Sequence, residues 1–180
     1  MSEPDPVDAA IDSLGILARR RIEAEILAPV YDELKAEIGV ERAREVLRKA
    51  VRRAAIAAGK AFGDRTPGGT DLTSFRAIQP LWTKDGALEI ETLQATPEAY
   101  DFNVRRCRYA EAYRKMGLAE IGSLLSCNRD GAFCEGYDPR LKLTRTQTIM
   151  EGADHCDFRY RLQDSEAGEA KPRGEQAANS

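Results

Sequence analysis

The chain has 180 residues, of which 42% are hydrophobic and 32% charged, and its formal charge at pH 7 is −3. This length and composition are typical of a soluble globular protein with one core, and the charge gives no electrostatic reason to expect a nucleic-acid partner. No stretch approaches the ~18 apolar residues of a membrane span, and the first residues are acidic where a signal peptide would be basic. We therefore expect a cytoplasmic protein without a membrane partner.

The chain contains four cysteines and one histidine, and it has no CxxC motif. Four cysteines are too few for a disulfide scaffold in a chain of this size, and a structural zinc site needs closely spaced thiol or imidazole ligands. We expect reduced thiols, no metal and no cofactor.

The first third of the chain has the periodicity of helices. From Asp12, a suitable N-cap, apolar residues recur up to Ile38 with an interruption at Pro29, which predicts one kinked helix or two collinear ones. Gly39 is a natural stop, after which residues 40–58 form a second amphipathic pattern. The glycine- and proline-rich residues 62–71 predict a loop, followed by a short helical stretch at residues 75–82.

Alternating and turn-bounded segments follow. Residues 87–94 and 99–105 predict an antiparallel hairpin, and residues 140–150 and 155–162 predict a second one across the turn EGAD. Two short helices, at residues 105–117 and 118–125, are expected between the hairpins.

This order of elements favours an α+β fold in which N-terminal helices pack on an antiparallel sheet of about four strands, arranged as two hairpins. We expect residues 1–162 to form a single domain. The tail at residues 163–180 is almost free of apolar side chains, which predicts disorder.

The segment 126–162 is the most reactive part of the sequence, with three cysteines and the histidine. Cys127, in the run SCNRD, could act as a nucleophile if Arg129 or a spatially adjacent His155 stabilised its thiolate. The alternative is a small buried cysteine, which is the commonest state of a free thiol.

His155, Cys156 and Asp157 are consecutive, so an extended strand places His155 and Asp157 on one face and Cys156 in the core. His155 could be a general base that a carboxylate orients, or simply a turn residue.

Arg145 alternates with aliphatic residues on the neighbouring strand, where burial would require a partner, so it either lines a polar pocket or meets solvent. In a pocket it would clamp a carboxylate through two parallel hydrogen bonds, and Asp130 and Glu135 would accept from a cationic nitrogen group. A metal site built from Cys127, Cys156, His155 and Asp130 has acceptable ligand types, but its spacing is irregular.

Three segments together, RCRYAEAYRKMGLAEIGSLLSCNRDGAF, EGYDP and LKLTRTQTIMEGADHCDFRYR, closely resemble the L-2-amino-thiazoline-4-carboxylic acid hydrolase family, from about residue 105 to residue 161. The glycine-containing turn followed by a Cys-x-Phe strand also looks like the small-ligand-binding vinyl-reductase-type domains and their TRAPP-like relatives. Those relatives have helices packed on an antiparallel sheet, which agrees with the order of elements above.

The resemblance implies hydrolysis of a small cyclic amidine- or isothiourea-type substrate, such as L-2-amino-thiazoline-4-carboxylate, to a carbamoyl amino acid. Such a reaction needs an arginine for the substrate carboxylate, a carboxylate for the amidinium, and a nucleophile or activated water at the central carbon. Either Cys127 attacks that carbon, or His155 with Asp157 activates water to do so.

The remaining candidates would bind the substrate. Arg145, with Arg108 or Arg159 as substitutes, would anchor the substrate carboxylate, and Asp130 or Glu135 would pair with the amidinium, with Asn128 close by. The alternatives to this hydrolase are a family member that acts on another cyclic substrate, a small-ligand-binding module without chemistry, and a subunit of a larger assembly. The aliphatic surface of the helices could also support a homodimer.

Overall fold

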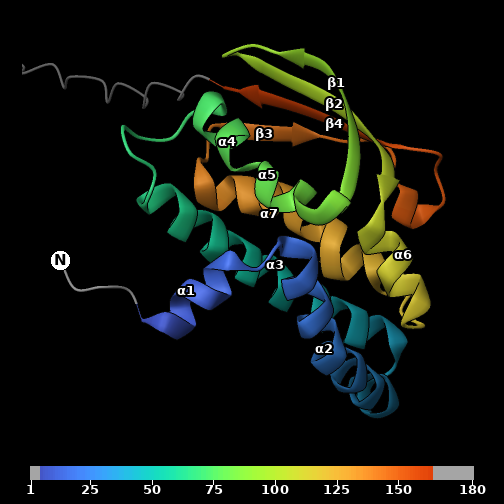
Figure 1. Cartoon of the computed structure of the whole chain (residues 1–180). Helices are drawn as coiled ribbons and strands as arrows, with labels where there is room; N and C mark the ends of the chain where they lie inside the picture. Colours follow the sequence, from blue (N-terminus) through green and yellow to red (C-terminus); the bar gives the residue numbers. More distant parts are fainter. Residues whose placement is uncertain (1–4, 164–180) are drawn as a thin grey trace, which may run out of the picture.

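The computed structural model describes residues 5–163, and the predicted disordered tail lies outside this range except for Gln163. Helices and an antiparallel sheet form separate layers (Figure 1). The helices are α1 (Pro6–Ser13), α2 (Ile16–Ile38), α3 (Val40–Asp64), α4 (Leu72–Ile78), α5 (Pro80–Thr83), α6 (Arg108–Lys115) and α7 (Asn128–Tyr137); the strands are β1 (Leu88–Ala95), β2 (Ala99–Cys107), β3 (Leu141–Thr144) and β4 (Cys156–Leu162).

The two long N-terminal helices form where the sequence predicts helix, but the first begins at Ile16 and not after Asp12, which belongs to the separate helix α1. Helix α2 continues through Pro29 to its end at Gly39, whose backbone has a φ of 79°. Because this left-handed conformation suits glycine, Gly39 separates α2 from α3. In α3, Ala43, Leu47 and Val51 are buried at a spacing of four residues, as on one face of a helix.

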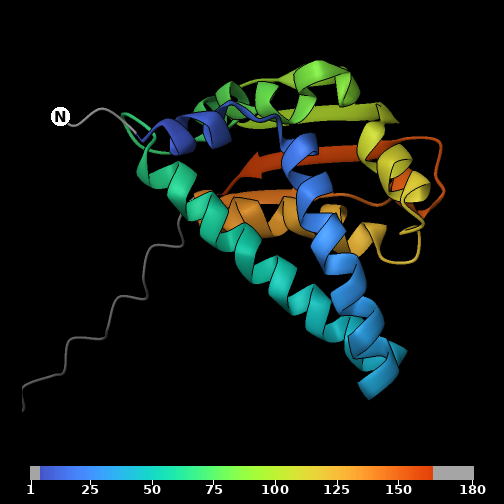
Figure 2. The same ribbon diagram turned by 60° about the horizontal axis from the view of Figure 1, so that its bottom comes forward.

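The sheet has the order β1-β2-β4-β3, and all its neighbouring strands are antiparallel. The predicted α+β fold with two hairpins is therefore confirmed, with β2 and β4 joining the hairpins at the centre. Side chains alternate across the sheet, so Tyr100 and Phe102 of β2 face the helices beside their partners Tyr160 and Phe158 of β4. This inner face packs over α7, which lies between the sheet and α3 (Figures 1 and 2).

Helix α7 was not predicted, and it follows directly on a π-helical turn at Ser123–Cys127, where the sequence predicted the end of an ordinary helix. Glycines explain both the missed prediction and the packing. A Cβ on Gly136 would lie 2.0 Å from the carbonyl oxygen of Ile56, and one on Gly59 would lie 2.1 Å from that of Phe133. Helices α3 and α7 therefore approach each other closely only because neither residue carries a side chain.

Strand β3 is shorter than predicted, since it ends at Thr144 instead of continuing to residue 150. Asp157 of β4 explains this end. Its carboxylate accepts hydrogen bonds from the backbone N–H groups of Thr146 and Gln147, both at 2.9 Å, in place of a strand-to-strand ladder. The chain then forms a short 3-10 turn at Ile149–Glu151 before it enters β4. Within residues 5–163, no helix is both long enough and apolar enough to cross a membrane.

Candidate functional site

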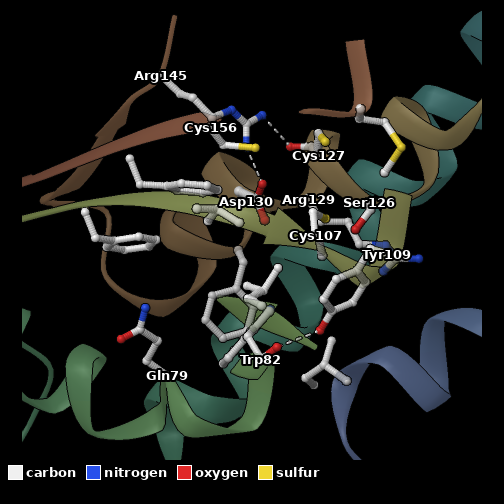
Figure 3. Close-up of a pocket in the computed structure, with 18 of the residues that line it drawn as sticks. Gln79, Trp82, Cys107, Tyr109, Ser126, Cys127, Arg129, Asp130, Arg145 and Cys156 are labelled. Carbon is white, nitrogen blue, oxygen red and sulfur yellow. Dashed lines mark hydrogen bonds and ion pairs between the residues drawn. The ribbon is translucent and has the colours of Figure 1, made fainter. Parts of the chain in front are cut away.

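A cavity of about 100 Å³ lies between the inner face of the sheet and the helices. This space corresponds to several water molecules, so it suits a small ligand. Figure 3 shows Arg145, Asp130 and Cys127 at one end of the cavity and Gln79 and Trp82 at the other. Its other lining residues are Ile16, Arg20, Ala55, Ala58, Phe75, Leu88, Tyr100, Phe102, Val104, Cys107, Tyr109, Ser126, Arg129, Phe133, Met150, Cys156, Phe158 and Tyr160.

Aromatic side chains of the sheet form one wall of the cavity. The rings of Phe102 and Phe158 stack with centroids 4.9 Å apart and an interplanar angle of 11°, and Tyr100 and Tyr160 stack beside them at 6.2 Å. Sequence periodicity placed Phe158 and Tyr160 in the core but did not show that this part of the core is hollow. These rings give the cavity a mainly apolar wall, as is common in small-molecule sites.

The main polar feature of the cavity is the ion pair between Asp130 and Arg145. Asp130 lies in the first turn of α7, and Arg145 directly follows β3. One Nη of Arg145 donates to Asp130 Oδ2, the other donates to the carbonyl oxygen of Cys127 at 3.1 Å, and the guanidinium lies 5.0 Å from the centre of the Phe158 ring. Of the candidates in the segment 126–162, Cys127, Asp130 and Arg145 therefore lie together at this cavity, whereas His155 does not line it.

Burial controls the protonation of this pair. It raises the pKa of Asp130, and the charge of Arg145 opposes the rise only in part. Burial acts to lower the pKa of Arg145, but Asp130, together with Cys127 and Tyr160, raises it overall, so the arginine stays charged. Asp130 thus binds a proton more readily than an exposed aspartate.

Three thiols line the cavity, and none is activated. Burial raises the pKa of Cys127 far above the ordinary value, and the charge of Asp130 adds to this effect. Burial likewise raises the pKa of Cys107 to about 11, and that of Cys156, whose sulfur accepts a hydrogen bond from Ile149 N at 3.2 Å. A thiol in such surroundings is a weak nucleophile because little of it is ionised.

His155 and Asp157 do not line the cavity and do not pair with each other. His155 Nδ1 lies 2.6 Å from Oδ1 of its neighbour Asp154 and 3.1 Å from the side-chain nitrogen of Gln147. Asp157 holds the segment after β3, and although burial opposes its charge, the hydrogen bonds from Thr146 and Gln147 lower its pKa. His155 and Asp157 therefore do not form the expected combination of a general base and the carboxylate that orients it.

The four remaining predicted residues lie away from the cavity, each with another partner. Arg108 binds the carbonyl oxygen of Asp85, Asn128 binds that of Arg48, and Glu135 pairs with Arg52. Arg159 donates to Asn103 on the outer face of the sheet. The outward position of Arg159 follows from strand alternation, because Phe158 and Tyr160 point inward.

Sequence reasoning missed Arg20 and Gln79, which line the cavity from elements far from the segment 126–162. It treated Arg129 as a neighbour of Cys127 and did not identify it as a ligand-binding group. Arg20 stands on a helix whose arginines resemble ordinary solvated residues, so only its three-dimensional position distinguishes it. Gln79 accepts a short hydrogen bond from the Tyr100 hydroxyl. In the part of the chain that the structure describes, no three His, Cys, Asp or Glu side chains are grouped to hold a metal ion.

Comparisons with known proteins agree with this architecture. The family model described as L-2-amino-thiazoline-4-carboxylic acid hydrolase matches residues 19–160, so the match includes α3 and most of α2. Among curated proteins, none matches the sequence.

Two solved structures are similar to this chain to different degrees. The phenol-responsive sensory domain of the transcription activator PoxR, crystallised with phenol, is 14% identical with a TM-score of 0.50 over 77% of this chain and 73% of that chain. A trafficking protein particle complex subunit 3 from Naegleria fowleri, covalently bound to palmitic acid, is 11% identical with a TM-score of 0.46 over 82% of this chain and 96% of that chain. At such low identity, the likeness to PoxR shows the fold alone.

Proposed function

Because the chain belongs to the L-2-amino-thiazoline-4-carboxylic acid hydrolase family, we propose that it hydrolyses a small cyclic amidine- or isothiourea-type substrate such as L-2-amino-thiazoline-4-carboxylate to a carbamoyl amino acid. One observation carries this proposal. The partly buried Asp130–Arg145 pair lies at one end of a cavity that is otherwise mainly apolar and aromatic. A buried ion pair is weak support for stability, whereas charged groups with perturbed pKa values are common at catalytic sites.

The chemistry of the substrate matches the cavity. The carbon between the ring nitrogen and the ring sulfur also carries the exocyclic amine, so it is bonded to two nitrogens and one sulfur. In the protonated form of the substrate these atoms make a flat cation. The apolar and aromatic lining suits the ring of the substrate, and the Asp130 carboxylate suits its N–H donors. The cavity therefore offers both the surface and the charge that such a group requires.

In the proposed reaction, Asp130 is the general base. It takes a proton from a water molecule as the water oxygen bonds to the ring carbon, and it passes that proton to the ring sulfur as the carbon–sulfur bond breaks. The proton of the new hydroxyl leaves to solvent as the carbonyl forms, which gives the carbamoyl amino acid. The raised pKa of Asp130 makes it a stronger base than an exposed aspartate, and Arg145 holds its carboxylate in place.

Water attack is favoured over attack by Cys127. The thiol would first have to ionise in a buried site beside the carboxylate of Asp130, and both conditions raise its pKa. Since His155 and Asp157 do not line the cavity, Asp130 takes the role that the sequence had suggested for them.

A second candidate is a small-ligand-binding domain without chemistry. The aromatic and apolar wall favours it, because such a wall binds planar molecules without any reaction. The phenol-responsive domain of PoxR has a related fold and was crystallised with phenol.

Incubation with L-2-amino-thiazoline-4-carboxylate distinguishes the two. For a hydrolase, mass spectrometry shows the addition of one water, and a thiol reagent detects the released thiol in proportion to enzyme concentration. If the substrate raises the melting temperature but no product or thiol forms, the protein is a small-ligand-binding domain and not a hydrolase for this substrate.

A further inference from the structure

Two arginines at the cavity share a single carboxylate. Arg20 of α2 donates to Glu23 Oε1 at 2.5 Å, and Arg129 of α7 donates to Glu23 Oε2 at 2.8 Å. The arginine side chains are only 13% and 11% exposed, whereas that of Glu23 is 39% exposed. Arg20 and Arg129 line the cavity, while Glu23 does not.

The charges around the cavity do not balance. Arg20, Arg129 and Arg145 line it with three positive charges, against one negative charge from Asp130 and one from the partly exposed Glu23. Burial lowers the pKa of Arg129, and the nearby charge of Arg20 lowers it further. An anion between the two guanidinium groups would relieve this repulsion.

We propose that Arg20 and Arg129 form the subsite for the carboxylate of an anionic ring substrate, which deepens the proposed function and rests on it. Arg145, the residue that the sequence favoured for this role, already donates to Asp130 inside the cavity and to the backbone of Cys127. Arg129 also donates to a backbone oxygen, that of Leu125, but its carboxylate partner Glu23 does not line the cavity. Arg129 and Asp130 are consecutive, so one turn of α7 presents a cation toward α2 and a carboxylate toward Arg145. The two charged ends of a zwitterionic substrate then bind at two different places, with the ring between them.

Binding of two non-hydrolysable probes tests the subsite independently of turnover. L-thiazolidine-4-carboxylate carries the acid group, and thiazolidine is the same ring without it; neither has the amidine carbon. Calorimetry on the full chain compares the wild type with Arg20→Gln, Arg20→Lys and Glu23→Gln. The Glu23 variant is the matched control, because it removes the internal competitor for both arginines.

We expect Arg20→Gln to weaken binding of the acid by about 10- to 100-fold, as for a lost charge-assisted hydrogen bond, with thiazolidine binding unchanged. Arg20→Lys should recover part of the loss, and Glu23→Gln should bind the acid more tightly than the wild type. Arg129→Gln should behave like Arg20→Gln if its melting curve shows a folded protein, and the Arg20 series decides the question if it does not.

The subsite is refuted if the wild type binds the two probes equally, if it does not bind the acid at millimolar concentration, or if Arg20→Gln weakens both probes alike. These outcomes are separate from failure of the hydrolase proposal. A chain that never opens the thiazoline but discriminates the acid through Arg20 keeps the subsite and loses the reaction.

Discussion

Two aspartate–arginine pairs lie on opposite faces of the sheet. Asp130 and Arg145 meet at the cavity on the inner face, and Asp101 of β2 binds Arg161 of β4 on the outer face. The outer arginine side chain is 48% exposed and the inner one 16%, whereas the outer aspartate side chain is 12% exposed and the inner one 24%. Solvent reaches the outer pair through Arg161 and screens it there, so the pair should stabilise the fold by about 0–1 kcal/mol.

The inner pair has the same groups in a different medium. Removing both charges from water costs free energy that their attraction recovers only in part, and the raised pKa of Asp130 reflects that cost. Stability therefore explains the outer pair better than the inner one. The comparison shows that environment, and not residue type, marks the inner pair as the candidate for chemistry.

Replacing each aspartate in turn gives the largest expected effect. Asp130→Asn should lower the rate of thiazoline ring opening by about 10²- to 10⁴-fold, because asparagine cannot accept the proton of the attacking water. Asp101→Asn, its counterpart on the outer face, should change the rate by less than about threefold. Rates from mass spectrometry, with circular dichroism to verify folding, decide between them. Equal effects of the two variants would remove the distinction between the faces.

The position of Asp130 depends on the close approach of α7 to α3, which Gly136→Ala should disrupt. The added Cβ would collide with the backbone carbonyl of Ile56, which no side-chain rotation can relieve. We expect a loss of at least about 1–3 kcal/mol in unfolding free energy, measured by urea denaturation.

Gly131→Ala is the matched control in the same helix, because a Cβ there would meet nothing within 4 Å. It should be neutral or stabilising by up to about 1 kcal/mol through helix propensity. If both alanines had the same effect, close contact would not be the reason for the glycine at position 136.

Periodicity was enough to predict much of the fold. Alternation identified β2 and β4, and helical spacing identified α2 and α3, because these elements have one buried face. It failed at α7, where Gly131 and Gly136 lower the apparent helix propensity while one of them serves a tertiary contact. It also extended β3 too far, because the hydrogen bonds from Thr146 and Gln147 to Asp157 replace strand pairing.

The candidate site was predictable only where its residues are close in sequence. Cys127, Asp130 and Arg145 lie in one dense segment, and they do meet. Arg20 comes from a helix more than a hundred residues earlier, and nothing in its local pattern separates it from solvated arginines. His155 was attractive as the sole histidine, but its position after the 3-10 turn places it outside the cavity.

The pH dependence of the rate would sharpen the contrast between the two faces. The proposed base must be ionised, so the rate should fall about tenfold per pH unit below the pKa of Asp130. Because burial raises that pKa, this acid limb should lie above the ~3.9 of an exposed aspartate. Arg145→Gln removes a charge that lowers the pKa and should move the limb to still higher pH. An acid limb that Arg145→Gln leaves in place would exclude Asp130 as the titrating group.

The smallest expected effect is that of Cys127→Ala, which separates the carboxylate from the thiol within the inner face. Arg145 contacts the backbone oxygen of Cys127 and not its sulfur, so alanine keeps the contact that holds Arg145 beside Asp130. With water as the nucleophile, the rate should stay within about threefold of the wild type, measured by the same mass assay. A loss comparable to that of Asp130→Asn, with a covalent adduct on the wild-type chain during turnover, would instead assign the attack to the thiol. Asp130 would then be the base that ionises Cys127, because a buried thiol beside a carboxylate becomes a nucleophile only by giving up its proton to a neighbouring group.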